Sequence, residues 1–385
     1  MKNKNIQNTT VLMIDSTVGN DYTLCLCENL HNEGTKVILV TPEDRKFYNK
    51  PDYDVKFWMP SKKQNKSKFL KIFKYFSYQF KILHYAILNK KSVIHYQFFR
   101  SRMDTIGFFV LRVFHKRLVH TAHNILPHEQ MKIDYFLNNL VYKSAEAIIV
   151  HSFSIKRKFL DNFKKDENKV FVVPHGNFDF FVDANSDKEI NNREVLNLNS
   201  NDKVMLFFGI VREYKGLNML LDAFEIAANN VNGLKLLIAG STASDEIRDE
   251  YVEKILSLKH GDKISHKFEF IPIKEVPIYF KAADVVLLPY KEIDHSGIIH
   301  LAYSFGKPVI ATRVGDFEEV IKHNKSGFIL DTNDVDDLAK WIEIAFSDTS
   351  KLKEMGDYCL DLSESKYSWK NVVAKTNEVY KKIDE

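Results

Sequence analysis

The 385-residue chain has a formal net charge of +4, with 45% hydrophobic and 28% charged residues, which excludes collagen-like and disordered chains. It is long enough for two domains with separate cores, and its three cysteines are too few for a disulfide framework or a metal-ligand set. The N-terminal residues lack an apolar signal region, and no run of about 18 apolar residues occurs, so we expect a cytoplasmic protein without a membrane span.

The first half of the chain alternates apolar runs with helical patterns, which predicts a doubly wound parallel sheet. The predicted strands are residues 11–14, 36–40, 55–59, 93–96, 118–121, 147–150 and 170–173. The turn after the first strand has a single glycine, Gly19, and lacks the GxGxxG pattern of dinucleotide-binding enzymes. Because ligands of open α/β sheets bind at the carboxyl ends of strands, Gly19 and Asn20 are expected either to approach a ligand or to form a plain tight turn.

A basic, aromatic segment lies in this half. Between Val55 and Met103 there is no Asp or Glu, whereas twelve Lys and Arg residues occur there. Apolar residues recur at helical spacing with lysines between them: Phe69, Phe73, Phe76, Phe80, Leu83 and Ile87, with Lys68, Lys71, Lys74 and Lys81. Such a helix is attracted to an anionic membrane surface, so residues 62–91 predict a peripheral membrane contact, and a core helix with a lysine-rich solvent face is the alternative. No nucleic-acid-binding motif accompanies the basic residues, and we predict no nucleic-acid partner.

A polar segment with three histidines, HTAHNILPHE at residues 120–129, follows the fifth predicted strand. Its spacing fits no standard zinc pattern, so a metal site is the less favoured interpretation. Polar loops at strand ends are typical of active-site edges. We therefore expect His123 or His128 to bind substrate or to transfer a proton.

The polar, asparagine-rich residues 183–200 predict a linker, with the two halves joined near residue 180. The alternation then starts again, with predicted strands at 204–208, 236–240, 268–271, 285–288, 309–312 and 327–330, a helix at 276–283 and three helical segments at the end. The predicted fold class is α/β, with two sheets whose strand ends border a shared cleft.

Two strand-to-helix turns of the second half have the features of anion sites. Gly209 ends a predicted strand and is followed by Arg212 and Lys215, whose guanidinium and ammonium groups suit phosphate oxygens. Ser296 and Gly297 precede a helix whose first backbone N–H groups point outward at its positive end. Each turn alone is also explained by an ordinary loop with solvated charges, and each is a candidate anion site.

Several motifs, in order, resemble one known family. They are HTAHNILPHE in the first half, and FFGIVREYKGLNMLLDAF, VPIYFKAADVVLLPY, SGIIHLAYSFGKPVIATRVGDFEEVI and YSWKNVVAKTNEVY in the second. These segments resemble the family-4 glycosyltransferases of the GT-B fold. The resemblance implies an acceptor-binding Rossmann-like domain at residues 1–180, a donor-binding one at 181–366, and a final helix at about 367–385 that packs back on the first.

The resemblance also implies roles for individual residues. Arg212 and Lys215 match the cations that bind the donor diphosphate, and Ser296 and Gly297 match the turn whose backbone meets it. His123 best matches the histidine near the reacting sugar. The implied reaction is retaining transfer of a hexose from a nucleoside-diphosphate sugar, without a metal or another cofactor.

One departure from the family concerns two glutamates that commonly contact the donor sugar and the ribose. Alignment on the tripeptide at residues 306–308 places Ile293 and Leu301 at these positions, and neither side chain accepts a hydrogen bond. Asp294, together with Glu318 or Glu319, is expected to substitute for them, and Glu319 is the preferred one of the latter two. The triplet Asp52-Tyr53-Asp54 matches the metal motif of a different glycosyltransferase fold, and we interpret it as a surface loop.

The sequence thus predicts a hexosyltransferase that acts on a saccharide or lipid-linked saccharide in surface polysaccharide synthesis, at the inner face of the cytoplasmic membrane. Two alternatives remain open. A nucleotide-sugar epimerase of the same fold would bind the same donor, and a non-catalytic nucleotide-sugar-binding scaffold would explain the lost glutamates.

Overall fold

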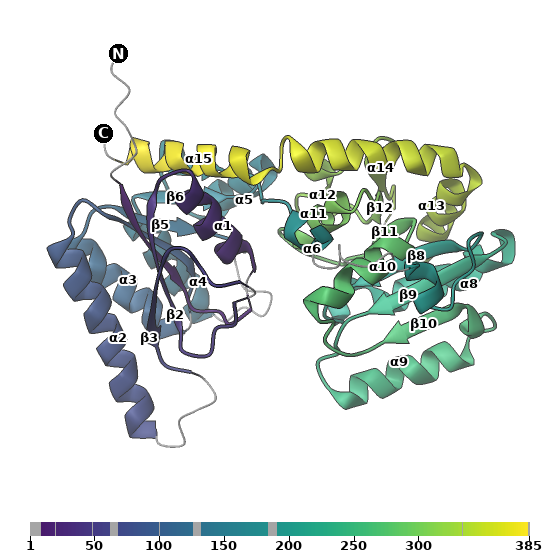
Figure 1. Ribbon diagram of the computed structural model, residues 1–385, viewed down its shortest axis with the longest axis horizontal. Helices are drawn as coiled ribbons and strands as arrows, with labels where there is room; N and C mark the ends of the chain where they lie inside the picture. The colour runs from purple at the N-terminus through teal and green to yellow at the C-terminus, as the bar shows by residue number, and fades with distance from the viewer. Residues whose placement is uncertain are drawn as a thin grey trace, which may run out of the picture. The chain divides into compact units, whose positions relative to one another are not determined.

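The computed structural model describes residues 9–19, 21–47, 49–61, 68–99, 101–125, 132–183, 191–332 and 334–383. Its internal contacts divide the chain into two compact units. Unit 1 comprises Met1–Gly176 and Trp369–Glu385, and unit 2 comprises Asn177–Ser368. Each unit contains one parallel β-sheet with helices on both faces (Figure 1).

The sheet of unit 1 has seven strands in the order β3-β2-β1-β4-β5-β6-β7, and all neighbours pair in parallel. Their bounds are β1 Thr10–Asp15, β2 Lys36–Pro42, β3 Asp54–Met59, β4 Val93–Phe98, β5 Leu118–Thr121, β6 Ala147–Val150 and β7 Val170–Val172. The central strands are buried on both faces, which explains why they read as continuous apolar runs. All seven strands lie at or within one or two residues of the predicted positions.

Side chains of alternate strand residues enter two separate cores, one on each face of this sheet. Leu12 and Ile14 pack under α2 (Lys68–Leu88), α3 (Arg102–Phe114), α4 (Lys132–Ser144) and α5 (Phe153–Asn162). Val11 and Met13 pack under α1 (Asp21–Asn32) and α15 (Trp369–Lys382). The final helix therefore covers the sheet of unit 1, beside α1 (Figure 1).

A buried ion pair fixes the start of the turn after β1. The side chains of Asp15 and Arg45 are both 0% exposed, and Arg45 Nη1 lies 2.8 Å from Asp15 Oδ2. Thr17 donates its backbone N–H and its hydroxyl to Asp15 Oδ1, while Arg45 donates to the Thr17 carbonyl at 3.0 Å. These bonds satisfy the polar groups that the turn toward Gly19 would otherwise bury unpaired.

The sheet of unit 2 has six parallel strands in the order β10-β9-β8-β11-β12-β13. Their bounds are β8 Lys203–Phe208, β9 Leu234–Ala239, β10 Ile264–Lys267, β11 Val285–Leu288, β12 Val309–Ala311 and β13 Gly327–Ile329. One face is covered by α8 (Leu217–Asn230), α9 (Asp245–Ser257) and α13 (Val335–Ser347), and the other by α6 (Asp179–Asp183), α10 (Val276–Ala282), α11 (Gly297–Ser304) and α12 (Phe317–Val320). The helix α14 (Thr349–Glu364) contributes to both cores, and the short α7 (Asn192–Val195) lies beside α10.

The prediction of a strand at residues 268–271 is wrong. The strand is β10, Ile264–Lys267, which pairs with β9 at the edge of the sheet and exposes Ser265 and His266. An edge strand has a neighbour on one side only, so polar residues are tolerated there and the apolar pattern that marks a central strand is absent. Phe268 is nevertheless buried in the core, which explains the mistaken prediction.

Candidate functional site

Lys215 is a buried charged residue of unit 2. It ends the short helix Glu213–Lys215 that follows β8, and only 9% of its surface is exposed. Burial, and secondarily the positive charge of Arg212, lowers the pKa of its ammonium group to about 8. Among the described residues, no carboxylate lies within ion-pair distance of it, whereas the Tyr290 ring lies 5.7 Å from its Nζ. A buried ammonium without a carboxylate is costly, and such a group is typical of a site for an anionic ligand.

The backbone at Gly209 leaves room for this ammonium. Gly209 directly follows β8 and has φ +100°, a conformation that favours glycine. A Cβ atom at this position would lie 3.2 Å from Lys215 Nζ and 3.6 Å from a side-chain carbon of Ile298. Gly209, Lys215 and the first turn of α11 are therefore close neighbours. Arg212 is exposed at the start of the same turn.

Ser296 caps α11 and lies beside this group. Its hydroxyl accepts the backbone N–H of Ile298 at 3.4 Å. Burial raises the pKa of the neighbouring Tyr290 phenol. Gly297 is the first residue of the helix, so its N–H belongs to the positive helix end. The structure thus brings Gly209, Lys215, Ser296 and Gly297 together at the carboxyl ends of β8 and β11, where strand order reverses and α/β sheets bind ligands.

The two expected substitutes for the glutamates occupy different surroundings. Asp294 is buried, and its carbonyl oxygen accepts the Asp316 backbone N–H at 3.1 Å. Glu319 is half-buried on α12, where its carbonyl oxygen accepts from Lys322 Nζ and its charge acts on Lys366. Leu301 is fully engaged in the apolar core of unit 2.

Sequence reasoning missed a buried histidine–carboxylate pair next to Ser296. His295 Nδ1 lies 2.6 Å from Asp316 Oδ2, with side chains that are 7% and 0% exposed. The two loops approach closely at Gly315, where a Cβ would lie 2.3 Å from the Ile293 carbonyl oxygen. The available signal was the polar run Asp294-His295-Ser296 at one strand end and Asp316 after the next strand.

Unit 1 gathers histidines at the carboxyl edge of its sheet. His123 follows β5, His151 follows β6 and His175 lies beyond β7. His123 Nδ1 is 3.0 Å from His151 Nε2, and its Nε2 is 3.0 Å from Gln97 Oε1 on β4. The ring of Tyr22, on α1, lies about edge-on to the His123 ring, with 5.1 Å between the ring centroids. The same Tyr22 ring lies 4.7 Å from the His175 ring, centroid to centroid. The sequence predicted His123 but not its partners.

The other residues predicted on this side are only partly described. Gly19 is exposed in the turn before α1, and nothing would lie within 4 Å of a Cβ atom there. Asn20 and His128 lie outside the described residues. His120 is a structural residue, since burial lowers its pKa to about 4 and its Nδ1 lies 3.0 Å from the Tyr96 carbonyl oxygen.

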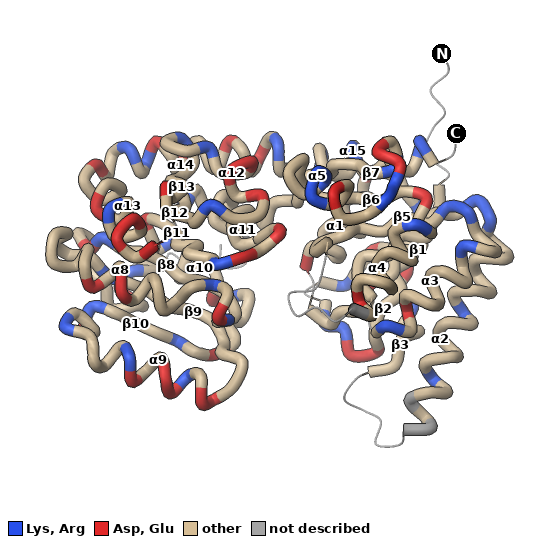
Figure 2. The backbone as a smooth tube through the Cα atoms, turned by 180° about the vertical axis from the view of Figure 1, so that it is seen from behind, with Lys and Arg blue, Asp and Glu red and all other residues tan. Residues whose placement is uncertain are grey.

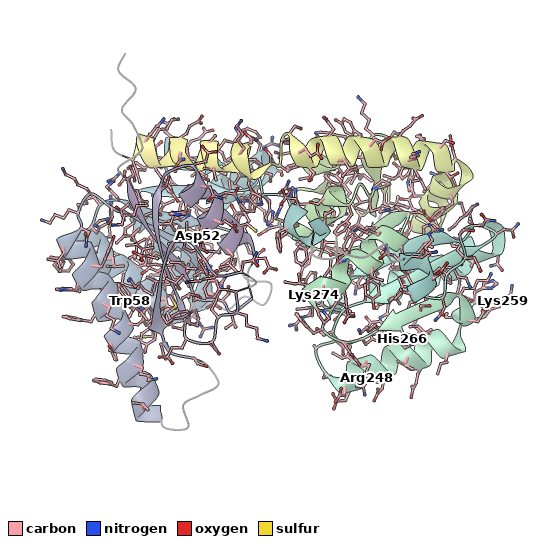
Figure 3. The ribbon with its side chains drawn as sticks, viewed as in Figure 1. Asp52, Trp58, Arg248, Lys259, His266 and Lys274 are labelled. Atoms are coloured by element: carbon pink, nitrogen blue, oxygen red, sulfur yellow. The ribbon has the colours of Figure 1, made fainter. Side chains whose placement is uncertain are left out.

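The D-x-D triplet lies at the surface of unit 1, as expected. Asp52, labelled in Figure 3, and Asp54 are exposed, whereas Tyr53 between them packs in the core under α1. Successive side chains of a strand point to opposite faces, and this alternation begins as the chain enters β3, so Tyr53 points into the core while Asp52 and Asp54 face solvent.

Two family models match the chain, "Glycosyltransferase Family 4" over residues 20–176 and "Glycosyl transferases group 1" over residues 188–359. An uncharacterized glycosyltransferase of Methanocaldococcus jannaschii is 30% identical over 246 residues, 62% of this chain and 60% of the relative. The capsular polysaccharide biosynthesis glycosyltransferase CapM of Staphylococcus aureus is 24% identical over 251 residues, 64% of each chain. The matches therefore span less than two thirds of either relative.

Two solved structures are similar over nearly the whole chain. Sucrose-phosphate synthase of Thermosynechococcus elongatus has a TM-score of 0.78 and 17% identity, with 98% of this chain and 99% of that chain covered. Anabaena HepE in complex with UDP-glucose has a TM-score of 0.74 and 16% identity, with 98% and 100% covered. At sequence identities of 17% and 16%, the similarity to these two structures shows a shared fold and no more.

The lowered pKa of Lys215 predicts a pH dependence of anion binding. The ammonium is charged below about pH 8 and becomes neutral as the pH rises through this value. Titration calorimetry with pyrophosphate, UDP and ADP is expected to show a binding advantage of the wild type over Lys215→Met that shrinks between about pH 7 and pH 9. Lys291→Met, at an exposed lysine paired with Glu213, is the control and should bind like the wild type. Equal affinity of the wild type and Lys215→Met at about pH 7 would contradict the assignment.

Proposed function

The chain belongs to the family-4-like glycosyltransferases with the GT-B fold of two Rossmann-like domains, and from this premise we propose that it transfers a hexose from a nucleoside-diphosphate sugar to a hydroxyl group. The proposed acceptor is a saccharide or lipid-linked saccharide of surface polysaccharide synthesis. The name of the relative CapM, which refers to capsular polysaccharide, supports this acceptor class. Structures of HepE contain UDP-glucose, which supports a sugar nucleotide as donor.

The single observation that carries this proposal is the buried ammonium of Lys215 beside Gly209 and the α11 helix start. Breaking the anomeric C–O bond places negative charge on the leaving diphosphate. Lys215, the exposed Arg212 and the Gly297 N–H would stabilise that charge as it develops. Fixed cations and N–H donors supply this stabilisation without a metal, so we propose metal-independent transfer. We infer retention of the anomeric configuration from the family alone.

Removing either cation should slow turnover strongly. We expect Lys215→Ala and Arg212→Ala to lower donor hydrolysis and sugar transfer roughly a hundredfold to a thousandfold, because each removes one stabilising group from the developing charge. Release of the nucleoside diphosphate is the measurement, with Lys291→Ala as the control that should retain activity. Full activity in both variants would disprove the diphosphate assignment.

The same assay separates the alternatives. An epimerase would return an isomerised sugar nucleotide and release no nucleoside diphosphate, so chromatography of the product identifies it. A non-catalytic scaffold would bind a sugar nucleotide without consuming it, and binding without turnover over hours would favour that alternative.

We also propose that unit 1 contacts an anionic membrane surface at the cytoplasmic side. None of the helices formed by the described residues combines the length and apolarity that a membrane span requires. On α2, however, the aromatic stripe faces solvent instead of the core: Phe73 is 63%, Phe76 57% and Phe80 67% exposed. The helix also packs on the core of unit 1 through Tyr78, Ile82 and Ala86, so its solvent face carries aromatic side chains as well as lysines. The side chains of Lys68 and Lys71 lie outside what the structure describes.

Two neighbouring helices extend this apolar surface. Exposed apolar side chains on α3 and α4 are Met103, Ile106, Phe109, Val110, Val113, Phe114, Ile133 and Phe136. The helices α2, α3 and α4 lie side by side on one face of the sheet (Figure 1). Asp104 on α3 ties α2 in place by accepting hydrogen bonds from Tyr75, Tyr78 and Gln79.

The charges around this surface favour a lipid over a protein partner. Figure 2 shows basic segments but no acidic one along α2, in keeping with the absence of Asp and Glu between Val55 and Met103. Each lysine near an anionic bilayer contributes roughly 1 kcal/mol, and each buried phenylalanine about 1.5–3 kcal/mol. A bilayer interface offers both an apolar layer and anionic headgroups.

Flotation with vesicles tests this contact. The wild type is expected to float with phosphatidylglycerol vesicles, and the triple variant Phe73→Ser, Phe76→Ser, Phe80→Ser to remain in solution. A double variant Leu256→Ser, Phe270→Ser removes equally exposed apolar side chains from unit 2 and should float normally. Equal recovery of all three proteins would exclude the proposed surface, and self-association of the wild type lost in the triple variant would instead indicate a contact between copies.

A further inference from the structure

The histidine pair of unit 1 lies within a continuous chain of hydrogen bonds. Its members, in order, are Tyr380 on α15, His95 and Gln97 on β4, His123, His151 and the Val173 carbonyl group, joined at 2.7, 3.2, 3.0, 3.0 and 3.1 Å. Thr121 completes the chain at His95 Nε2, at 2.8 Å. The chain runs along the carboxyl ends of the strands, where ligands of α/β sheets bind.

The outer partner of each histidine is a carbonyl oxygen, which can only accept a hydrogen bond. The Val173 carbonyl oxygen, 3.1 Å from His151 Nδ1, has no proton to donate, so His151 Nδ1 carries one. Gln97 Oε1, 3.0 Å from His123 Nε2, likewise only accepts, so His123 Nε2 carries a second. The inner nitrogens, His123 Nδ1 and His151 Nε2, lie 3.0 Å apart and need a third proton between them. With two protons only, two lone pairs would face each other at that distance.

Met13 fixes the orientation of the Gln97 amide on which this count depends. Gln97 Nε2 lies 3.4 Å from Met13 Sδ and 3.2 Å from His95 Nε2. A thioether sulfur accepts weakly and never donates, so the amide NH₂ group belongs on this side and the oxygen faces His123. His95 is able to accept, because burial lowers its pKa to about 3 and keeps its ring neutral.

We propose that His123 and His151 hold one proton more than two neutral imidazoles, so that His123 meets its ligand as an N–H donor and not as a base, with His151 as its positioning residue. The ligand class is an oxygen that bears or develops negative charge, such as a phosphoryl, carboxylate or carbonyl oxygen, which would replace Gln97 Oε1 as the acceptor. The proposal rests on the proposed function only for the identity of that ligand. It deepens the expectation from the sequence, which left His123 either to bind substrate or to transfer a proton.

The surroundings of the pair agree with a positive charge. The His123 ring stacks on Phe98 at 4.3 Å with 7° between the planes, an arrangement that favours a cationic ring over an aromatic face. From the described elements, Tyr22 of α1 and His175 beyond β7 are titratable groups that lie against the pair, and His95 of β4 lies one hydrogen bond farther along the chain. Burial raises the pKa of Tyr22, so its hydroxyl stays neutral and does not compensate the charge.

A spectroscopic measurement on the free protein tests the proton count. The protein is labelled with ¹⁵N-histidine, and the rings are assigned by their loss in His123→Phe and His151→Phe. At about pH 7 the pair should show three protonated ring nitrogens and release one proton as the pH rises. Two neutral rings, each with one bare nitrogen, would overturn the proposal. Because no substrate is present, this outcome is separate from any failure of the proposed function.

Two substitutions at His151 then separate positioning from simple structural support. His151→Gln places an amide oxygen near the position of Nε2, so the ¹⁵N spectrum should still show a protonated, charged His123 ring. In His151→Phe the His123 ring should be neutral. If the chain transfers sugar, His151→Phe should lower kcat roughly a hundredfold, the scale of a lost proton donor, and shift the alkaline limb of the pH profile to lower pH. His151→Gln should restore most of both. Equal loss in the two variants, with equal thermal stability, would refute the positioning role.

Discussion

Unit 2 contains one costly arrangement, the burial of the Lys215 ammonium where no described carboxylate lies within ion-pair distance. Burial lowers its pKa to about 8, so the folded protein holds this charge against a desolvation penalty. An anionic ligand would relieve the penalty, and two nearby elements suit the proposal of such a ligand. Gly209 keeps the space beside Nζ open, and the start of α11 adds backbone N–H groups. Both lie at the reversal of strand order, so the fold itself places the charge where a ligand can reach it.

In unit 1, polar groups also lie at the strand ends. These groups are satisfied by one another, through the Asp15–Arg45 ion pair under the first turn and the hydrogen-bonded chain that includes His123 and His151. The final helix contributes Tyr380 to that chain, so the C-terminal residues help to position the histidines. On the opposite face of the sheet, α2, α3 and α4 leave apolar side chains in solvent, which a protein without a partner surface would bury.

Much of the architecture could be predicted from the sequence because parallel strands buried on both faces are continuous apolar runs. The edge strand Ile264–Lys267 was missed, since partial exposure removes that pattern. Among the site residues, Lys215 and Ser296 were predicted from their position at strand-to-helix turns, but their roles in binding are still proposals. His151 and Gln97 were not predicted, because residues from separate strands become neighbours only through sheet order. Nor did helical periodicity decide whether the aromatic stripe of α2 faces the core or solvent.

The most direct test of the central claim is the structure of a complex with the sugar nucleotide that most raises the melting temperature in a screen of UDP, GDP, ADP and their common sugars. In that complex we expect diphosphate oxygens within hydrogen-bonding distance of Lys215 Nζ and the Gly297 backbone N–H. A complex with the diphosphate bound elsewhere, or the absence of stabilisation by every nucleotide in the screen, would contradict it.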